Sequence, residues 1–530
     1  MSSRTLTSRS AAGGSVGPSA VLLATFRIAL VAISMSAFGQ IPDSHPTDEE
    51  RGLLKNLPGA YEGYTIIAPL KSTSTYLIDM NGQIVHEWQS SYTPTFGIYL
   101  LANGHLLRAA RDPDNLSFDL GGYGGIVQEI GLDGTIAWEY RYSSRQQIQH
   151  HDIELLPNGN VILLAWERKN ARDALISGRD PEMITGLGLW SEHLVEIRPT
   201  RPEGGEIVWE WHVWDHLIQN RDPRVSHYGK VEDHPELVNI NGDLGHRRES
   251  AEEIARLRAL GYIADSNPDQ DPRRRSDKQK ADWTHANSVS FNPQLDLLAL
   301  SVLRFDEIWI IDHSTSTSEA AGHNGGKAGR GGDLIFRWGN PQVYRGARFA
   351  DRQKLFGQHD VSWIRSGFPG AGNLLVFNNG RGRPNGDHSS VDEIRLPRDL
   401  TQSAKLKATV NSDDPERVWS FSGSGADRFY SAHISGAQRL ANGNTLVCVG
   451  EFGRIFEVTS SGRIVWDYLN PFMGDYSGKP SPPWARSTTP ASSAEETRYG
   501  LARAIRISPA HPGIIKLLRT SGSLFVGETR

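Results

Sequence analysis

The chain has 530 residues, of which 38% are apolar and 22% are charged, and its formal net charge is −5. This composition is ordinary for a soluble globular protein, and the small charge without a basic face argues against nucleic-acid binding. The single cysteine, Cys448, excludes an intramolecular disulfide and a cysteine-based metal site. The 54 glycines and 14 tryptophans indicate many turns and short strands, and therefore an all-β fold.

The N-terminus has the pattern of an export signal. Arg27 and two earlier arginines precede or begin an apolar run over residues 28–38, and small residues within it offer cleavage sites. We therefore expect residues 1–39 to be a cleaved signal peptide, residues 40–60 to be a linker, and the protein to be periplasmic or secreted. The alternative is an uncleaved membrane anchor, which Arg27 and the marginal length disfavour. Only in that case is a membrane expected as a partner.

One short motif occurs six times along the rest of the chain. It has a turn residue, mostly glycine, then aliphatic residues, and then two aromatic positions separated by a polar residue. The copies span residues 82–88, 134–140, 205–211, 332–338, 415–421 and 462–468. The glycine indicates a hairpin turn, and the residues after it predict a strand with aromatic side chains on one face.

A second motif consists of two apolar stretches joined by a turn, which is typical of a β-hairpin. Its turns lie at residues 103–104, 158–159, 292–293, 367–373, 442–443 and 512–513. The two motifs alternate strictly, which predicts a six-bladed β-propeller over residues 61–530. Residues 504–518 then pair with residues 64–88 in one shared blade, which closes the ring and protects its edge strands. Strict alternation argues against the alternative of two separate β domains.

One insertion, at about residues 216–280, interrupts the repeats and is polar and rich in charge. Within it, residues 250–260 have a capping serine, early acidic residues and apolar residues at helical spacing, which predicts a short amphipathic helix. The insertion either covers one face of the propeller as a lid or rim, or is a plain surface excursion. The basic run at 273–275 is expected to be a solvated loop.

A histidine precedes four of the six hairpin turns by an odd number of residues. These histidines are His151, His285, His359 and His433. Because side chains alternate along a strand, offsets of seven and nine residues place all four on the same side. The innermost strands of a propeller surround its central channel. We therefore expect four imidazoles to converge at one mouth of this channel.

Converging histidines can bind a metal, bind an anion, or act in nucleophilic and acid–base catalysis. A metal site usually also has carboxylate ligands, but Asp152 and Asp360 directly follow two of the histidines and therefore point to the opposite face. A metal is consequently the second interpretation. Arg381 or Arg383, in a glycine-rich stretch after the His359 strand, can reach the mouth, and arginine with imidazole donors suits a tetrahedral oxyanion.

Four segments carry these side chains in a specific order. They are Asp-Trp-Thr-His-Ala-Asn-Ser at 282–288, Gly-Gln-His-Asp at 357–360, Phe-Asn-Asn-Gly at 377–380 and Ser-Ala-His-Ile-Ser at 431–435. Together with the repeat pattern, they resemble the bacterial aryl-sulfate sulfotransferase family, from about residue 61 to the last blade. The resemblance implies a six-bladed propeller that transfers a sulfuryl group from a phenolic sulfate ester to a phenol, with no nucleotide donor, metal or other cofactor.

The resemblance also implies roles for individual residues. His433 matches the histidine that is transiently sulfated, and His285 and His359 match two histidines that hold the sulfuryl oxygens. Arg383 matches the arginine of the site best, and Arg381 remains the alternative.

Further residues are expected to bind substrate. His151 has a repeat position that places it near the other histidines, and Asn287 belongs to one of the family segments. Trp283, Phe96 and Tyr430 are candidates for stacking on phenol rings. The expected partners are small aryl sulfates and phenols, and the sequence leaves the oligomeric state open.

Other functions remain open at this point. A metal-dependent hydrolase of sulfate or phosphate esters would use the same channel mouth, and a non-catalytic binding propeller would retain only the fold. A quinone-cofactor dehydrogenase propeller would have eight blades, and many such proteins carry a vicinal cysteine pair, which a single cysteine excludes.

Overall fold

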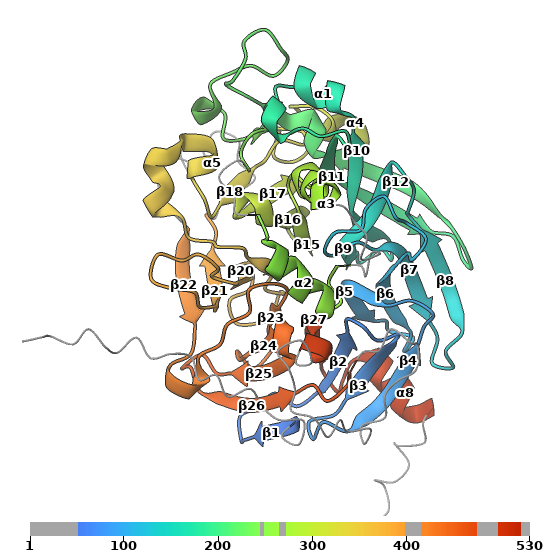
Figure 1. Ribbon diagram of the computed structural model, residues 1–530. Coiled ribbons are helices and arrows are strands. Elements are labelled where there is room, and N and C mark those ends of the chain that lie inside the picture. The colour runs from blue at the N-terminus through green and yellow to red at the C-terminus, as the bar shows by residue number, and fades with distance from the viewer. Residues whose placement is uncertain (1–50, 244–247, 264–271, 398–414, 474–496, 521–530) are drawn as a thin grey trace, which may run out of the picture. The chain divides into compact units, whose positions relative to one another are not determined.

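The computed structural model of this chain describes residues 51–243, 248–263, 272–397, 415–473 and 497–520, which all belong to one structural unit. Among these residues, six antiparallel sheets of at least four strands form the blades of a ring (Figure 1). The predicted six-bladed β-propeller is thereby confirmed. The expected signal peptide, residues 1–39, lies outside the described residues. Across the described ranges, no helix has the length and apolar character needed to cross a membrane.

The first three blades use strands from the N-terminal half and one strand from the C-terminal end. Blade 1 contains β27 (Leu501–Ile507), β2 (Tyr64–Pro69), β3 (Ser74–Ile78) and β4 (Ile84–Gln89). Blade 2 contains β5 (Pro94–Leu100), β6 (Leu106–Arg111), β7 (Gly125–Ile130) and β8 (Ile136–Arg141). Blade 3 contains β9 (Gln147–Leu155), β10 (Val161–Lys169), β11 (Leu189–Pro199) and β12 (Gly205–His212).

The other three blades follow the insertion. Blade 4 contains β15 (Ala286–Asn292), β16 (Leu297–Val302), β17 (Glu307–Asp312) and β18 (Phe336–Trp338). Blade 5 contains β19 (His359–Trp363), β20 (Leu374–Asn378), β21 (Ser390–Arg395) and β22 (Glu416–Phe421). Blade 6 contains β23 (Gly436–Arg439), β24 (Thr445–Val449), β25 (Arg454–Val458) and β26 (Ile464–Leu469). Short helices α1 (Ala171–Ile176), α4 (Thr317–Ala320) and α5 (Gln342–Arg345) lie in connections between strands.

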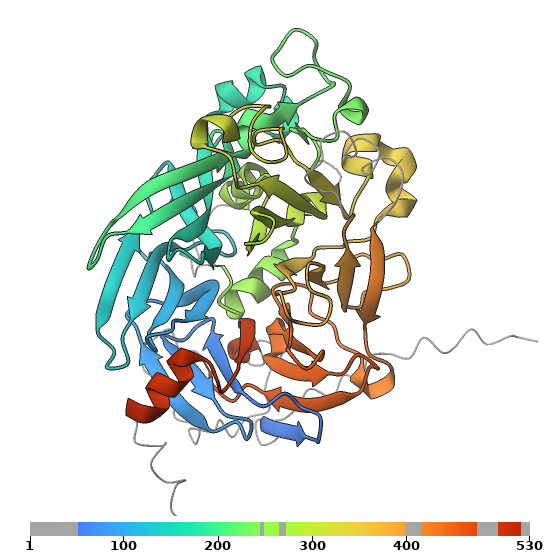
Figure 2. The same ribbon diagram turned by 180° about the vertical axis from the view of Figure 1, so that it is seen from behind.

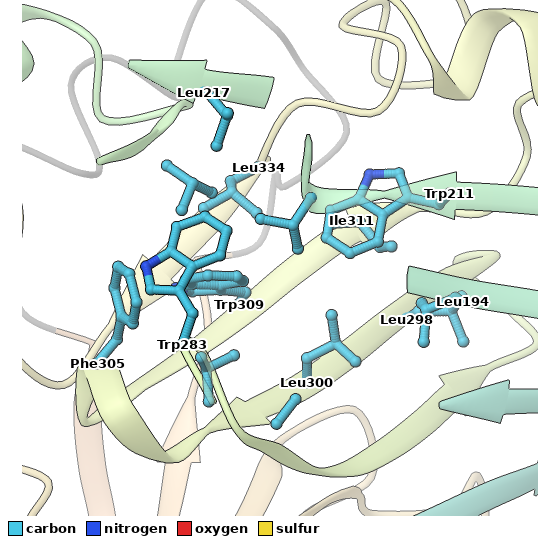
Figure 3. Packing of buried hydrophobic residues seen from close by; sticks show 14 of the residues in the cluster. Leu194, Trp211, Leu217, Trp283, Leu298, Leu300, Phe305, Trp309, Ile311 and Leu334 are labelled. Atoms are coloured by element: carbon cyan, nitrogen blue, oxygen red, sulfur yellow. The ribbon is translucent and has the colours of Figure 1, made fainter. Parts of the chain in front are cut away.

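The two sequence motifs occupy fixed places in the blades. The aromatic motif forms the outermost strand of each blade: β4, β8, β12, β18, β22 and β26. The first strand of each sheet lies innermost, and β27, β5, β9, β15, β19 and β23 contact one another in turn around the channel. Buried apolar clusters join neighbouring blades, and one of them packs Trp211 of blade 3 with Leu298 and Ile311 of blade 4 (Figure 3).

Blade 1 closes the ring as predicted, because β27 pairs antiparallel with β2. The hairpin expected at residues 512–513 is wrong, since the chain there forms helix α8 (Pro512–Thr520). A proline suits the first turn of a helix. Ile514 and Leu517 are three residues apart and share a buried face that packs on blades 1 and 2.

The expected linker is also partly wrong. Residues 40–60 include strand β1 (Gly52–Asn56), which pairs with β26 as a fifth strand of blade 6. β26 is buried along its whole length. The added strand covers an edge that would otherwise present unpaired backbone groups.

The insertion contains a short parallel pair, β13 (Leu217–Ile218) and β14 (Val238–Asn239), and the helices α2 (Ala251–Ala259) and α3 (Pro272–Ala281). Helix α2 confirms the predicted amphipathic helix, and it begins with a capping box between Ser250 and Glu253. The basic run at 273–275, expected in a loop, lies in α3 instead.

Residues 248–263, which we call the lid segment, cover one mouth of the central channel. Apolar side chains of this segment, including Leu257 and Tyr262, pack against Phe96 and Ile434 at the inner strands. Both views show α2 over the middle of the ring (Figures 1 and 2). The structure therefore favours the lid over a plain surface excursion.

Candidate active site

The four histidines lie at equivalent breaks in the inner strands. Residues at or beside them have positive φ angles: His151 (50°), His285 (49°), Asp360 (55°) and Ile434 (50°). The strand registers shift at the first three of these places, as in β-bulges. Positive φ is uncommon for residues other than glycine. Its repetition in four blades indicates that the same local backbone conformation turns the imidazoles toward the mouth of the channel.

The imidazoles converge beneath the lid segment, as predicted. The ring centroids of His151 and His285 are 4.7 Å apart. His285, His359 and His433 line one cavity of about 20 Å³ together with Tyr262 of the lid segment. A cavity of this volume holds about one water molecule, so the site is closed in this conformation.

Tyr262 connects the lid segment to the histidines. Its hydroxyl oxygen lies 2.7 Å from Nε2 of His151 and 3.2 Å from Nε2 of His285. Burial, together with the negative charges of Asp282 and Glu249, raises the pKa of this phenol far above its ordinary value. Tyr262 is therefore an uncharged phenol held between two imidazoles.

A buried carboxylate orients His285. Oδ2 of Asp282 lies 2.6 Å from Nδ1 of His285, which leaves Nε2 facing the cavity. Burial raises the pKa of Asp282, but the opposing effects of His285 and Arg304 are larger and bring it to about 2. The carboxylate is therefore ionised, and Nδ1 of His285 carries the proton that it donates to Asp282.

His359 is fixed as a neutral imidazole. Asn379 Nδ2 donates to two backbone carbonyls, so its Oδ1, 2.8 Å away, faces Nδ1 of His359. Nδ1 therefore carries the proton, and Nε2 is buried without a hydrogen-bond partner in the described part of the chain. Burial and the nearby His285 lower the pKa of His359 to about 3, although the hydrogen bond that His359 donates to Asn379 opposes this.

His433 is also neutral at physiological pH. Burial lowers its pKa well below the ordinary value, and the positive charge of Arg381 lowers it further. Nη1 of Arg381 lies 3.4 Å from Nε2 of His433. Because a guanidinium only donates, Nε2 of His433 presents its lone pair to the arginine.

The structure separates the two candidate arginines and selects Arg381. Arg381 Nη1 lies beside Nε2 of His433, whereas Arg383 Nη2 donates to Ser390 Oγ at 2.7 Å. The contact with His433 therefore favours Arg381, the alternative, over Arg383. Gly380 and Gly382 both have positive φ, which turns the chain on each side of Arg381 and points the two arginines to different places.

Carboxylates of the lid segment, together with Asp282, neutralise the arginines of the site. Arg381 lies 3.5 Å from the carboxylates of both Glu249 and Glu253. Arg304 lies 3.0 Å from Glu249 and 3.2 Å from Asp282. Burial opposes ionisation of Glu249, but Arg304 and Arg381 hold its pKa well below the ordinary value. An anion entering the site would compete with these carboxylates for Arg381.

A different ion cluster uses the two aspartates that follow histidines. Asp152 and Asp360 both bind Arg503, at 2.9 and 2.6 Å, and so point away from the imidazoles as predicted. Arg503 borders a larger cavity of about 650 Å³ at the hairpin end of the inner strands. None of the four converging histidines lines that cavity, so we take the smaller one as the candidate active site.

Comparison with known protein families agrees with this geometry. The family model described as Arylsulfotransferase (ASST) matches residues 61–466, which include all four histidines and Arg381. The chain belongs to this family. A search of curated proteins finds no match.

The solved structures that resemble this arylsulfotransferase-family chain are distant from it. A protein of unknown function from Bacteroides caccae is 9% identical, with 84% of this chain and 99% of that chain covered and a TM-score of 0.40. Virginiamycin B lyase from Staphylococcus aureus is 12% identical, with 78% and 86% covered and a TM-score of 0.32. Hydrazine synthase from Kuenenia stuttgartiensis is 12% identical, with 63% and 68% covered and a TM-score of 0.32. These scores are too low to support any argument.

Two expected substrate contacts of the family segments are wrong. Trp283 is fully buried beside Phe305 and Trp309 in the core of blade 4, not at the mouth (Figure 3). Asn287 Nδ2 donates to the backbone oxygen of Gln358 at 2.8 Å, which ties two inner strands together. Both residues therefore support the blades that carry the histidines.

The other two aromatic candidates, Phe96 and Tyr430, make different contacts. The Phe96 ring meets the His151 ring edge-on, with centroids 5.1 Å apart, and also contacts Tyr262. Phe96 therefore borders the site, where the lid segment covers it. Tyr430 donates its hydroxyl to Asp387 at 3.0 Å.

Sequence reasoning missed four residues of the site: Glu249, Tyr262, Asp282 and Arg304. Asp282 stands three residues before His285 in a family segment, and this spacing is a signal that could have revealed it. The other three lie in the insertion or just after β16, where no repeat marks them.

Proposed function

We propose that this protein transfers a sulfuryl group from an aryl sulfate to a phenol, and that His433 carries the group between them. The observation that supports this most directly is a buried, neutral His433 whose Nε2 lies beside Arg381, in a cavity that other histidines also line. Membership of the arylsulfotransferase family supports the reaction class.

In the first step, Nε2 of His433 attacks the sulfur atom of the aryl sulfate. An N–S bond forms while the bond from sulfur to the phenolic oxygen breaks, and the electron pair leaves with the phenolate. Arg381 donates to the sulfuryl oxygens, where negative charge builds as the sulfur is attacked.

In the second step, an acceptor phenol attacks the same sulfur atom, and the N–S bond breaks to return its electron pair to His433. The acceptor must lose a proton, and His285 suits this role because its Nε2 has a lone pair facing the cavity. The carboxylate of Asp282 then stabilises the imidazolium that forms.

His359 needs the substrate in order to act as a donor. In the free protein its Nε2 has a lone pair, so it can hold a sulfuryl oxygen only after it takes up a proton. A nearby negative charge raises the pKa of an imidazole. The charge of a bound aryl sulfate therefore favours the protonated form that the supporting role requires.

An aryl sulfate with a chromogenic phenol tests the proposal. We expect continuous phenol release when an acceptor phenol is present, and about one equivalent per chain when it is absent, because the sulfated histidine then has no partner. Equal, continuous release under both conditions would identify a hydrolase. Loss of release on chelation would favour the metal-dependent hydrolase, and binding without release would favour the non-catalytic propeller.

The lid segment must open before a substrate can enter. The cavity of about 20 Å³ is far smaller than an aryl sulfate, and the Tyr262 hydroxyl occupies the space between His151 and His285. Tyr262 therefore stabilises the closed form with the same imidazoles that a substrate needs.

We expect Tyr262→Phe to increase kcat/KM for the donor by roughly fivefold, because the phenol has one proton to donate and the hydrogen bond lost with it contributes about 1 kcal/mol to the closed form. Steady-state kinetics with a chromogenic donor measure this effect. Tyr228→Phe is the matched control, since Tyr228 lies in the same insertion with 54% of its surface exposed. A fall in kcat at constant KM would contradict the expectation and indicate that Tyr262 takes part in the chemistry.

A further inference from the structure

Two histidines and an aspartate form a cluster outside the candidate active site. His216 follows β12, and His323 and Asp333 belong to the long connection between β17 and β18. Nδ1 of each imidazole lies 2.8 Å from Oδ1 of Asp333, and the three atoms lie within 4.8 Å of one another. His216 and Asp333 are buried, whereas 58% of the His323 side chain is exposed. The cluster therefore reaches solvent through His323.

The surroundings fix the orientation of His216. Its Nε2 lies 2.9 Å from the backbone oxygen of Ala320, and because a carbonyl oxygen only accepts, Nε2 carries a proton. The ring stacks on Trp211, with centroids 5.9 Å apart and planes at 12°. The backbone of Gly332 also lies close to the His216 ring. A Cβ atom at this position would be 2.6 Å from Nε2, so only glycine leaves room for the imidazole. Nδ1 of His216 is consequently the nitrogen that faces Asp333.

This orientation places two acceptors against each other. A neutral imidazole with its proton on Nε2 has a lone pair on Nδ1, and this lone pair faces a carboxylate oxygen of Asp333. A cation between them resolves the conflict, either as a second proton on His216 or as a metal ion. His323 directs another nitrogen to the same oxygen, which favours the metal. A ligating histidine also commonly donates its other N–H to a carbonyl oxygen, as His216 does.

We propose that His216, His323 and Asp333 bind one Zn²⁺ ion, with water as the fourth ligand. Two imidazole nitrogens and one carboxylate oxygen suit Zn²⁺, whereas Ca²⁺ and Mg²⁺ prefer sites built from oxygen ligands. Tetrahedral ligands at about 2.0–2.2 Å from zinc are about 3.3 Å apart. Each imidazole nitrogen therefore needs to move roughly half an ångström from the Asp333 oxygen when the ion binds.

The ion would join two distant parts of the chain. His216 and Asp333 are 117 positions apart in the sequence. His216 stands at the start of the insertion that supplies the lid segment, and Asp333 belongs to blade 4. Zinc would anchor the insertion to that blade and stabilise the folded state, because it binds the folded chain preferentially. None of the three ligands lines the cavity of the candidate active site, so the proposal does not depend on sulfuryl transfer.

Zinc titration of the metal-free, full-length protein tests this proposal. The protein is treated with a chelator, dialysed and titrated with Zn²⁺ against a chromophoric zinc competitor, and its melting temperature is measured in parallel. We expect one Zn²⁺ per chain and a higher melting temperature. Asp333→Asn and His323→Ala should each weaken binding by more than the roughly tenfold to hundredfold that loss of an outer hydrogen-bond partner causes.

His105→Ala is the matched control, because His105 is a partly exposed histidine that contacts a carboxylate in blade 2. It should bind zinc as the unchanged protein does. Asp333→Asn retains the shape of the side chain and keeps the test valid if His323→Ala fails to fold. The proposal is overturned if the unchanged protein binds no zinc and its melting temperature does not respond, or if Asp333→Asn binds zinc equally well. A protonated His216 paired with Asp333 would then account for the cluster.

Discussion

Replacement of His433 by alanine is expected to abolish both phenol release from an aryl sulfate and transfer to an acceptor. Without Nε2 of His433 no N–S bond can form, so both half-reactions should fall by roughly 10⁴-fold or more. A single turnover with a chromogenic donor measures the first half-reaction. Peptide mass spectrometry of the unchanged protein, mixed with donor alone, should locate the sulfuryl group on the peptide that contains His433.

Two other outcomes have definite meanings. A sulfuryl group on the peptide of His285 or His359 would reassign the nucleophile while keeping the covalent route. Full activity in His433→Ala, together with loss of activity on chelation, would favour the metal-dependent hydrolase. His105→Ala serves as the control, because its side chain contacts Glu129 in blade 2 and not the site.

The six blades could be predicted because each consists largely of hairpins between consecutive strands, and the turn residues of these hairpins are recognisable in the sequence. The Asn-Gly turns at 103–104, 158–159 and 442–443 each join two neighbouring strands. Elements without a local partner were not predictable in this way. Strand β1 pairs with β26, and its residues 52–56 are too short and mixed in character to indicate which edge they would cover.

The convergence of the histidines was predicted from a regular alternation that the structure does not fully keep. The registers shift at the histidines of blades 3, 4 and 5, which breaks the alternation within each strand. The register shift occurs at the same level of the inner strand in each of these blades. The histidine side chains are therefore displaced in the same way and still converge. The agreement thus depends on the repetition of the bulge and not on the parity of a single strand.

The lid contacts could not have been predicted from the repeats. Helix α2 was predictable from its own capping residues and apolar spacing, which are local. The placement of Tyr262 between His151 and His285 depends on how an insertion folds back over blades that lie far away in the sequence. No pattern within residues 248–263 specifies that contact.

Arg381→Ala is expected to lower kcat/KM for the donor by roughly 10²–10³-fold, whereas Arg383→Ala should have a much smaller effect. Arg381 is the guanidinium beside Nε2 of His433, where charge develops on the sulfuryl oxygens. Arg383 instead donates to Ser390 at the start of β21 in blade 5. The two residues have the same side chain and stand two positions apart, so each is the matched control of the other. A larger loss in Arg383→Ala than in Arg381→Ala would contradict the assignment.

The dependence of the rate on pH provides a second readout for the same pair. Burial lowers the pKa of His433, and the positive charge of Arg381 lowers it further. Removal of Arg381 should therefore raise this pKa toward the ordinary value of a histidine. Because only the neutral imidazole attacks sulfur, activity is lost as the pH falls through the pKa of His433, and this loss should begin at a higher pH in Arg381→Ala. The acid limb of kcat/KM should keep its position in Arg383→Ala, and an unchanged limb in Arg381→Ala would show that this arginine does not act on His433.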